Sequence, residues 1–550
     1  MRNKYFWIFP FCLFMLFTDV MPSLADTTVG GVISSDTTWT LAGSPYNVTS
    51  TVQVYGTSTT PATLTIEPGV VVKFASGTGL QIGSSSSQGA LVAQGTSSSR
   101  ITFIRSGTSG TWGSVTFLAG TVSATTDLEN VDIQYSTGVT ITSSSPTIRN
   151  STITNVTGNG LYLTSANPTI DTVTVGSAGS YGIYLSSSSP TITNSTITNN
   201  GSYGIYLSSS SPTVTGGSLT NTSATGQGIY GSGSPVISNY TVSSANSAGI
   251  YGLYLSTTTS ALSVTNSTVS NGLYIGSTAV IPTVSGNTFT NLDNSPLHAG
   301  ANIIGQIVAN NTLTGQTSAG RVEVVGEQVS QNTTWNQLVA PYVVVSGTVS
   351  VYNSTTTAST LTIAPGTVVK FASGTGLQIG NSTNKGALVA QGTTASRITL
   401  TRSGTSGTWG SVSLQAGTVN ATTDMENVDI QYSSGVTMTS CAPTIRNATI
   451  TSVTGYGLNL SSANPVIDTV TITNNGSYGI NLSSSSPIIT GGSLTNTSAT
   501  GQGIYGSGSP LISNYTVSSA NSAGLYGLYL SSTTSALSVT NSTISNGLYI

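Results

Sequence analysis

Apolar and polar residues alternate along most of this chain, and the alternation repeats about every 22 residues. With the proline that opens each repeat as position zero, positions two and seven are aliphatic, as in Ile192 and Ile197, and their neighbours are mostly Thr, Ser or Asn. A third segment reads GIYL at 204–207, with its tyrosine between two aliphatic residues. A period of two is typical of short strands with one buried face. We therefore expect three strands in each repeat, with the tyrosine outward and turns at the Gly and Ser-Ser-Ser-Ser stretches.

The length of the repeat is read from its prolines, which recur 22 or 23 residues apart. They are Pro146, Pro168, Pro190, Pro212 and Pro235, and then Pro443, Pro465, Pro487 and Pro510. No segment has the periodicity of a helix. Three short strands in about 22 residues predict an all-β fold, a right-handed parallel β-helix in which each coil pairs with the coils above and below it.

The chain also contains a much longer repeat. VVKFASGTGLQIG occurs at 71–83 and again 297 residues later, at 368–380, whereas GQGIYGSGSP at 226–235 returns after only 275 residues. The difference of 22 residues is one coil. We therefore divide the mature chain into a first module, 26–320, and a second module, 321–550, that lacks one coil. The final NGLYI also occurs inside module one, where further coils follow it, so we expect the array to be truncated at its C-terminus.

The first 25 residues are typical of a secretory signal peptide. Arg2 and Lys4 precede an apolar run at 5–17, and Ala25 is a small residue suited to cleavage. The run is shorter than the roughly 20 residues needed to span a membrane, and no second such run follows. We expect the mature protein to be secreted or at the cell surface, with no transmembrane segment.

Composition excludes nucleic-acid binding, an internal disulfide and a disordered chain. Charged residues make up 5% of the chain and the formal net charge is -3, so there is no basic surface for a nucleic-acid partner. Cys12 lies in the predicted signal peptide and Cys441 is alone in the mature chain, which excludes an internal disulfide. The regular apolar positions argue against disorder.

Several runs in module one resemble a known group of proteins. They are LTIEPGVVVKFASGTGLQIG, GALVAQGT, ITFIRSG, TWGSVTF and LENVDIQYS, all between residues 64 and 136. They resemble the entry region of bacterial secreted β-helix repeat proteins of the pectin-lyase-like superfamily, and the later coils resemble its short repeats. The resemblance implies the fold but not one activity, because such coils occur in lyases, hydrolases, adhesins and other surface proteins.

One set of charged residues is a candidate catalytic site. Aligning the coils stacks Glu129, Arg149 and Asp171 in an outward column, with Asp132 nearby. Module two repeats the column as Glu426, Arg446 and Asp468, with Asp429 nearby. Enzymes of the resembled superfamily use Arg near acids and calcium, which would make this a polysaccharide lyase or hydrolase site. We favour the alternative of a salt-bridge ladder between coils, because few further carboxylates lie near it.

The histidine residues that catalytic dyads, triads and many metal sites need are almost absent from this chain. His298 is the only histidine, so no His dyad, His-metal cluster or Ser-His-Asp set can form. We expect no metal site and no cofactor. Asn130, Asn150 and Asn194 share one position, with Thr172 between the last two, and we expect a ladder of amides bonding from coil to coil. The same ladder explains most of the Asn-x-Ser/Thr sequences, so we do not infer glycosylation from them.

Two outward columns could bind a ligand. Tyr162, Tyr184 and Tyr206 recur once per coil, and exposed aromatic faces at that spacing could stack on a polysaccharide or a cell-surface glycan. Module two has Asn459 and Asn481 at the matching positions, so the fold does not require the tyrosines. Thr-x-Thr pairs such as Thr152 and Thr154 suggest, more remotely, a surface that orders water or ice. They are interrupted in later coils and also suit a plain solvated strand.

These observations favour a secreted, non-catalytic β-helix scaffold that is adhesive or contacts glycans. A polysaccharide lyase or hydrolase is the alternative, and an ice-binding surface is the remote one. Many weak contacts repeated along a rod would gain strength from multivalency.

Overall fold

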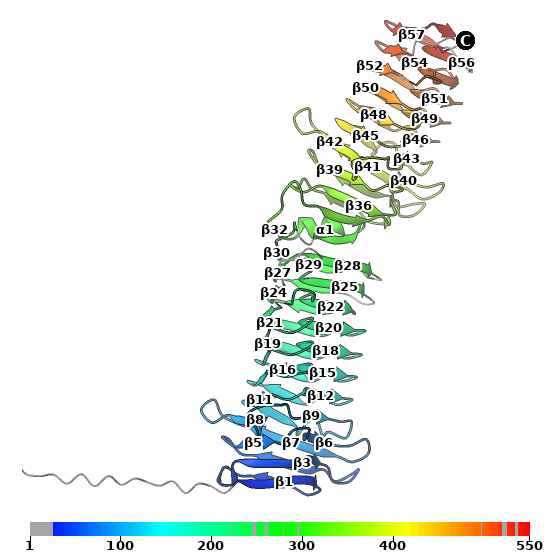
Figure 1. The fold of residues 1–550 in the computed structure, drawn as a ribbon. Coiled ribbons are helices and arrows are strands. Elements are labelled where there is room, and N and C mark those ends of the chain that lie inside the picture. The colour runs from blue at the N-terminus through cyan, green and yellow to red at the C-terminus, as the bar shows by residue number, and fades with distance from the viewer. Residues whose placement is uncertain are drawn as a thin grey trace, which may run out of the picture.

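The alternating segments form the strands that their pattern predicts, and strands of successive coils pair in parallel with each other. The computed structural model describes residues 26–221, 223–244, 249–258, 262–278, 280–293, 296–496, 498–519, 525–533 and 537–550. The predicted signal peptide, residues 1–25, lies outside these residues. The coils stack into a long rod (Figure 1), which confirms the predicted all-β parallel solenoid.

Each coil of module one contributes a strand to each of three columns, called here the first, second and third column in chain order. The first column contains β2 (Thr37–Trp39), β4 (Ala62–Ile66), β7 (Gly89–Gln94), β10 (Asp127–Glu129), β13 (Thr147–Arg149), β16 (Thr169–Asp171), β19 (Thr191–Thr198), β21 (Thr213–Thr220), β23 (Val236–Ser238), β26 (Ser263–Thr265) and β29 (Thr283–Ser285). The second contains β3 (Tyr46–Val54), β5 (Val71–Phe74), β8 (Ile101–Arg105), β11 (Val131–Gln134), β14 (Thr152–Thr154), β17 (Thr174–Gly176), β24 (Thr241–Ser243), β27 (Thr268–Ser270), β30 (Thr288–Thr290) and β32 (Thr312–Leu313). The long strands β19 and β21 belong to both columns.

The third column of module one carries the tyrosines. It contains β6 (Leu80–Ile82), β9 (Ser114–Phe117), β12 (Gly138–Thr142), β15 (Leu161–Thr164), β18 (Ile183–Ser186), β20 (Ile205–Ser208), β22 (Ile229–Ser232), β25 (Leu253–Thr258), β28 (Leu273–Thr278) and β31 (His298–Gly300). The N-terminal strand β1 (Thr27–Ile33) pairs with both halves of β3.

Module two repeats the three columns. Its first column contains β35 (Thr333–Trp335), β38 (Ser359–Ile363), β41 (Gly386–Gln391), β44 (Asp424–Glu426), β47 (Thr444–Arg446), β50 (Val466–Asn475), β52 (Ile488–Thr495), β54 (Leu511–Ser513) and β57 (Ser538–Thr540). Its second contains β36 (Tyr342–Ser346), β39 (Val368–Phe371), β42 (Ile398–Arg402), β45 (Val428–Gln431), β48 (Thr449–Val453), β55 (Thr516–Ser518) and β58 (Thr543–Ile544), and shares β50 and β52 with the first. Its third contains β34 (Gln328–Val329), β37 (Thr348–Val351), β40 (Gly376–Ile379), β43 (Ser411–Leu414), β46 (Gly435–Thr439), β49 (Leu458–Ser461), β51 (Ile480–Ser483), β53 (Ile504–Ser507), β56 (Leu528–Ser532) and β59 (Leu548–Tyr549).

The core is a stack of the aliphatic positions found in the sequence. Ile192 and Ile197 are fully buried, as are Ile205 and Leu207 on the third strand. Burying one such side chain contributes about 1.5–3 kcal/mol. The glycine before the third strand is needed for close packing, because a Cβ at Gly182 would lie 2.6 Å from the carbonyl oxygen of Gly204 in the next coil.

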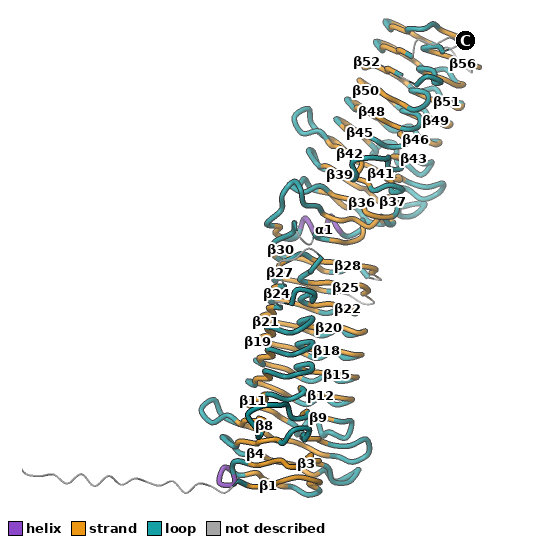
Figure 2. The backbone as a smooth tube through the Cα atoms, viewed as in Figure 1, coloured by secondary structure: helices purple, strands orange, loops and turns teal. Residues whose placement is uncertain are grey.

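A short helix near the end of module one contradicts the prediction that no segment is helical. Helix α1 (Ile304–Ala309) buries Ile304, Ile307 and Val308, and a single 3-10 turn, η1 (Leu41–Gly43), lies near the N-terminus. Six residues are too few for a helical period to stand out from the surrounding alternation. Helix α1 contacts β29 below it and β35 above it, and the rod changes direction at this level (Figure 2). No helix among the described residues has the length and apolar character needed to cross a membrane.

The columns do not continue straight through the junction between the modules. The third column of module one passes from β31 to β33 (Val322–Val325) and then to β36, which belongs to the second column of module two. The third column of module two is a separate sheet of ten strands that begins at β34. The same strand position therefore lies on different faces of the rod in the two modules.

Candidate functional site

The charged column has the predicted register but different partners. Strand pairing places Glu129 beside Arg149 and Arg149 beside Asp171. The Arg149 Nη2 atom lies 2.7 Å from Asp127 Oδ2 and 3.0 Å from Glu129 Oε2. Asp171 forms no ion pair with Arg149; it accepts hydrogen bonds from the Thr193 hydroxyl at 2.5 Å and the Asn194 amide at 3.3 Å. The expected acid–Arg–acid ladder is therefore wrong at its third member.

Asp127 is the residue that the sequence alignment missed. It and Glu129 both point outward from β10, and the long arginine side chain reaches the diagonal neighbour as well as the direct one. Module two has the same arrangement, with Arg446 bound to Asp424 and to Glu426 at 3.1 Å. Asp468 accepts a hydrogen bond from Thr490 and, like Asp171, has no ion pair among the described residues.

A second ion pair lies beside the first. Arg100 binds both carboxylate oxygens of Asp132, at 2.9 Å from Nε and 2.7 Å from Nη2, and donates to the Asn150 carbonyl two coils on. Burial alone would raise the pKa of Asp132. The hydrogen bonds from Arg100 and Thr152 and the positive charge of Arg100 act in the opposite direction and outweigh burial, so the net effect is a lowered pKa. Asp429 has the same partner type in Arg397, at 2.7 Å. Each guanidinium thus ties neighbouring coils together, and the catalytic role of these residues stays a prediction.

The shared asparagine position is a left-handed corner. Asn130, Asn150 and Asn194 have φ of about 50°, and Thr172 has φ 55°. Their side-chain amides donate hydrogen bonds to the preceding coil, as expected. The acceptors, however, are backbone and carboxylate oxygens and not the side chains of other asparagines. Asn130 donates to the Gly95 carbonyl and Asn150 to the Glu129 carboxylate. The backbone conformation explains the residue type, because asparagine tolerates this region far better than most residues.

The residue after the corner explains the Asn-x-Ser/Thr pattern. Ser151 and Ser195 point inward, are buried, and accept hydrogen bonds from the backbone N–H groups of Val131 and Val173 in the preceding coils. The next residue starts an outward-facing strand position, where threonine is favoured. The pattern is therefore what this corner requires.

The tyrosine column is longer than the three residues predicted. Tyr162, Tyr184 and Tyr206 lie in register, and the column continues through Tyr230, Tyr254 and Tyr274 to His298. The ring centroids of successive members are 4.1–5.8 Å apart. Tyr181 and Tyr203 pack beside the column.

Neighbouring tyrosine rings stack on one another, so the column lacks the open ring faces that the prediction of sugar stacking assumed. The Tyr184 and Tyr206 rings are 5.0 Å apart with only 9° between their planes, and Tyr162 stacks on Tyr184 at 4.9 Å. From Tyr162 to Tyr206 each ring therefore covers the face of the next and turns its edge and hydroxyl group outward. Tyr230 is tilted by 32° against Tyr206 and stacks on Tyr203 instead. Tyr162, at the end of the stack, is 37% exposed. Sugar rings cannot lie flat on faces that are already covered.

The tyrosine hydroxyls remain available to a ligand. Among the described residues, none forms a hydrogen bond with the hydroxyl of Tyr162, Tyr184, Tyr206 or Tyr230. Burial raises the pKa of Tyr184, and neighbouring tyrosines raise it further, so its hydroxyl stays protonated at neutral pH. Thr164, Ser186 and Ser208 run beside the tyrosines on the same strands. The surface is thus uncharged and rich in hydroxyl groups.

His298 closes the column at the junction. Its ring stacks on Tyr274 with centroids 4.1 Å apart, and Nδ1 lies 2.8 Å from Glu323 Oε2. Arg321 binds the other oxygen of Glu323 at 2.5 Å. Burial raises the pKa of Glu323, but its bonds to His298 and Arg321 outweigh this, and the pKa is lowered. No group of three or more His, Cys, Asp or Glu suited to a metal ion is found in the described part of the chain.

Threonines also form long columns in module one. Strand pairing aligns the residues of the second column, and seven of the eight positions are threonine. They are Thr152, Thr174, Thr196, Ser218, Thr241, Thr268, Thr288 and Thr312. The companion column that begins at Thr154 is interrupted by Gly176, as expected from the sequence. Ice binding stays a prediction.

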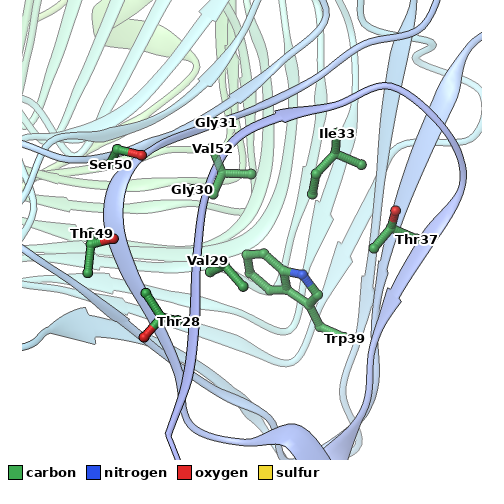
Figure 3. A pocket seen from close by; sticks show the side chains of 10 residues that line it. All are labelled: Thr28, Val29, Gly30, Gly31, Ile33, Thr37, Trp39, Thr49, Ser50 and Val52. Carbon is green, nitrogen blue, oxygen red and sulfur yellow. The ribbon is translucent and has the colours of Figure 1, made fainter.

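A hollow lies at the N-terminal end of the rod. It has a volume of about 550 Å³ and lies between β1, β2 and β3 (Figure 3). Val29, Ile33 and Trp39 point into it, while Thr28 and Ser50 lie on its rim. The residues that line it are apolar, glycine, serine or threonine, with no ionisable side chain among them.

Comparison with known proteins agrees with the fold. A family described as right handed beta helix region matches residues 115–269, 164–313 and 434–549, which together are more than half of the chain. The match confirms the predicted right-handed β-helix and its short repeats. No curated protein matches this chain.

Proposed function

Because the chain belongs to the right-handed β-helix family, we propose that it is an exported, non-catalytic scaffold that contacts polysaccharide through its tyrosine columns. The observation that carries the proposal is the run of edge-on rings from Tyr162 to Tyr274, one per coil, with hydroxyl groups outward. A continuous row of half-exposed aromatic edges is unusual on a protein surface, and apolar surface that stays in contact with water often marks an interaction site.

The surroundings of the column favour a neutral ligand. The neighbouring strand positions carry hydroxyl groups, and the basic residues that an acidic polymer would need lie on other columns or at the junction. Hydrogen bonds from single hydroxyls are weak, but several on one rigid rod act together. Residues 1–25, as a signal peptide, would deliver the scaffold to the outside of the cell, where such polymers occur.

The test compares two substitutions at the centre of the column on a glycan array. Tyr206→Phe with Tyr230→Phe keeps the ring stack and removes two hydroxyls, and we expect at least a several-fold loss of binding. Tyr352→Phe, outside the column, is the matched control and should bind normally. Unchanged binding by the double variant would remove the hydroxyl column from the proposal, and no binding by the parent chain to any glycan would refute the function itself.

The lyase alternative places its site at Arg149. The carboxylates of Asp127 and Glu129 both bind that guanidinium, and Arg446 has the same pair of ion pairs in module two, which supports a structural role. Incubation with uronate polymers, with and without calcium, separates the two functions. Unsaturated products that disappear in Arg149→Ala would establish the enzyme instead.

A further inference from the structure

The two modules do not present their tyrosines on the same face of the rod. In module one the tyrosine column leads through His298 to Glu323 and then to Val343 on β36. From β36 the pairing continues along the second column of module two, through Lys370 to Thr401. Above the tyrosines of module one the column therefore continues with Glu323, Val343, Lys370 and Thr401 in place of tyrosine.

The tyrosines of module two lie in a separate sheet. Tyr505, Tyr529 and Tyr549 are in register on β53, β56 and β59, and their rings stack at 5.2 and 4.4 Å. Below them the column continues with Asn481 and Asn459, whose amides bond to each other at 2.9 Å. This sheet starts at β34 and has no strand from module one.

The spacing of the column selects the form of its ligand. Successive rings follow the strand spacing of about 4.8 Å. An extended β-1,4-linked chain of pyranose sugars advances by nearly that length per sugar, so one sugar can face each coil over several coils. A coiled α-1,4-linked chain loses this match after one or two sugars.

A straight polymer aligned with one column cannot reach the other. At the junction it would leave the tyrosines and run onto Glu323 and Lys370, and the rod also changes direction there (Figure 1). The two tyrosine columns therefore form two separate faces rather than one long face.

We propose that the chain bridges two separate β-1,4-linked polysaccharide chains, one along the tyrosine column of each module. This inference rests on the proposed function. Bridging by a rigid rod with two faces would join polymer chains into a network, which a single continuous binding face would not do.

The experiment uses beads of two colours, both coated with cellohexaose, and the full mature chain. One variant carries Tyr206→Asn with Tyr230→Asn in module one, and the other carries Tyr505→Asn with Tyr529→Asn in module two. Asn459 and Asn481 show that this fold accepts asparagine in the column. Beads coated with an α-1,4-linked maltohexaose are the ligand control, and sedimentation measures whether the protein is monomeric.

We expect the parent chain to join beads of both colours, with an optimum at intermediate protein concentration. Each variant should still bind single beads through the tyrosine column that it keeps, several-fold more weakly than the parent, but should lose at least nine-tenths of the mixed clusters. Loss of all binding in either variant would show one shared site and overturn the inference, as would mixed clusters formed by both variants or by a dimer. Binding to other glycans but not to cellohexaose would refute this ligand class while leaving the proposed function standing.

Discussion

Replacing Thr172 by asparagine should stabilise module one, and this substitution tests the account of the corner most directly. Thr172 has φ 55°, a region that costs most non-glycine residues about 1–2 kcal/mol and is worse for a β-branched side chain. Its neighbours in the stack, Asn150 and Asn194, have the residue that tolerates this conformation. The Thr172 side chain is exposed and makes only a 3.3 Å hydrogen bond to Asp171, so little packing is lost.

The gain expected from Thr172→Asn is about 1 kcal/mol, taken from the lower end of the backbone cost. We do not add a side-chain bond, because the preceding coil has Arg149 where other corners find an acceptor such as Glu129. A gain of that size should slow hydrogen exchange in β16 and β17 about fivefold if local opening limits it. Local exchange is the right assay, since a long repeat array need not unfold in one step.

The control is Thr174→Asn, two residues later on extended strand β17, which should exchange no more slowly than the parent. Thr172→Gly should also slow exchange, but by less, because glycine gains freedom in the unfolded chain. If Thr172→Asn exchanges as fast as the parent, strain at the corner is not the reason for its residue preference. Thr469, with φ 56°, offers the same test in module two.

Three further predictions concern stability and the repeat. Burial raises the pKa of Glu327 above its ordinary value of 4.5, although the hydrogen bond from the Asn302 N–H opposes the shift. The stability linked to this raised pKa is therefore complete below pH 4.5 and is lost as the pH rises through the pKa of the folded protein. Glu327→Gln should therefore raise the melting temperature at neutral pH and lose this advantage in acid, and an equal advantage at both pH values would contradict the burial argument. Asn475 is buried in register with Val453, and its side chain has no hydrogen bond from a described residue. Asn475→Val should stabilise this coil by about 1–3 kcal/mol, measured as slower hydrogen exchange in β48 and β50, and faster exchange would contradict the argument. Deleting residues 175–196 recreates the IDTVTITNNG junction that module two has at 467–476, so that variant should fold with parent-like circular dichroism. Deleting 175–185 breaks the 22-residue register and should prevent this, and equal outcomes for the two deletions would show that the register is not essential to the fold.

The fold was predictable because each position of the repeat recurs in many coils. A period of two fixes which residues are buried, and the spacing of the prolines fixes which residues stack, so the pairing of Glu129 with Arg149 followed directly. Helix α1 was missed because it occurs once and is shorter than two turns. A single irregular element has no repeat to reveal it.

The candidate sites were predicted less well because their chemistry depends on side-chain direction. Register places Tyr184 beside Tyr206, but only the side-chain torsions decide whether the ring faces are open or stacked. The same is true of Arg149, whose length lets it reach Asp127 on the diagonal. The change of column at the junction could not be predicted either, because it depends on β33 pairing with β31 below and β36 above.

The duplication separates what the fold needs from what a ligand could use. Positions that stay the same in both modules include the ion pairs at Arg149 and Arg446 and the corners at Thr172 and Thr469, and the structure gives each of them a mechanical role. The first coils of the outward tyrosine column differ, since Asn459 and Asn481 replace Tyr162 and Tyr184 without changing the register. A column that the coil can do without is free to be shaped by binding, so the tyrosines carry more information about function than the charged residues do.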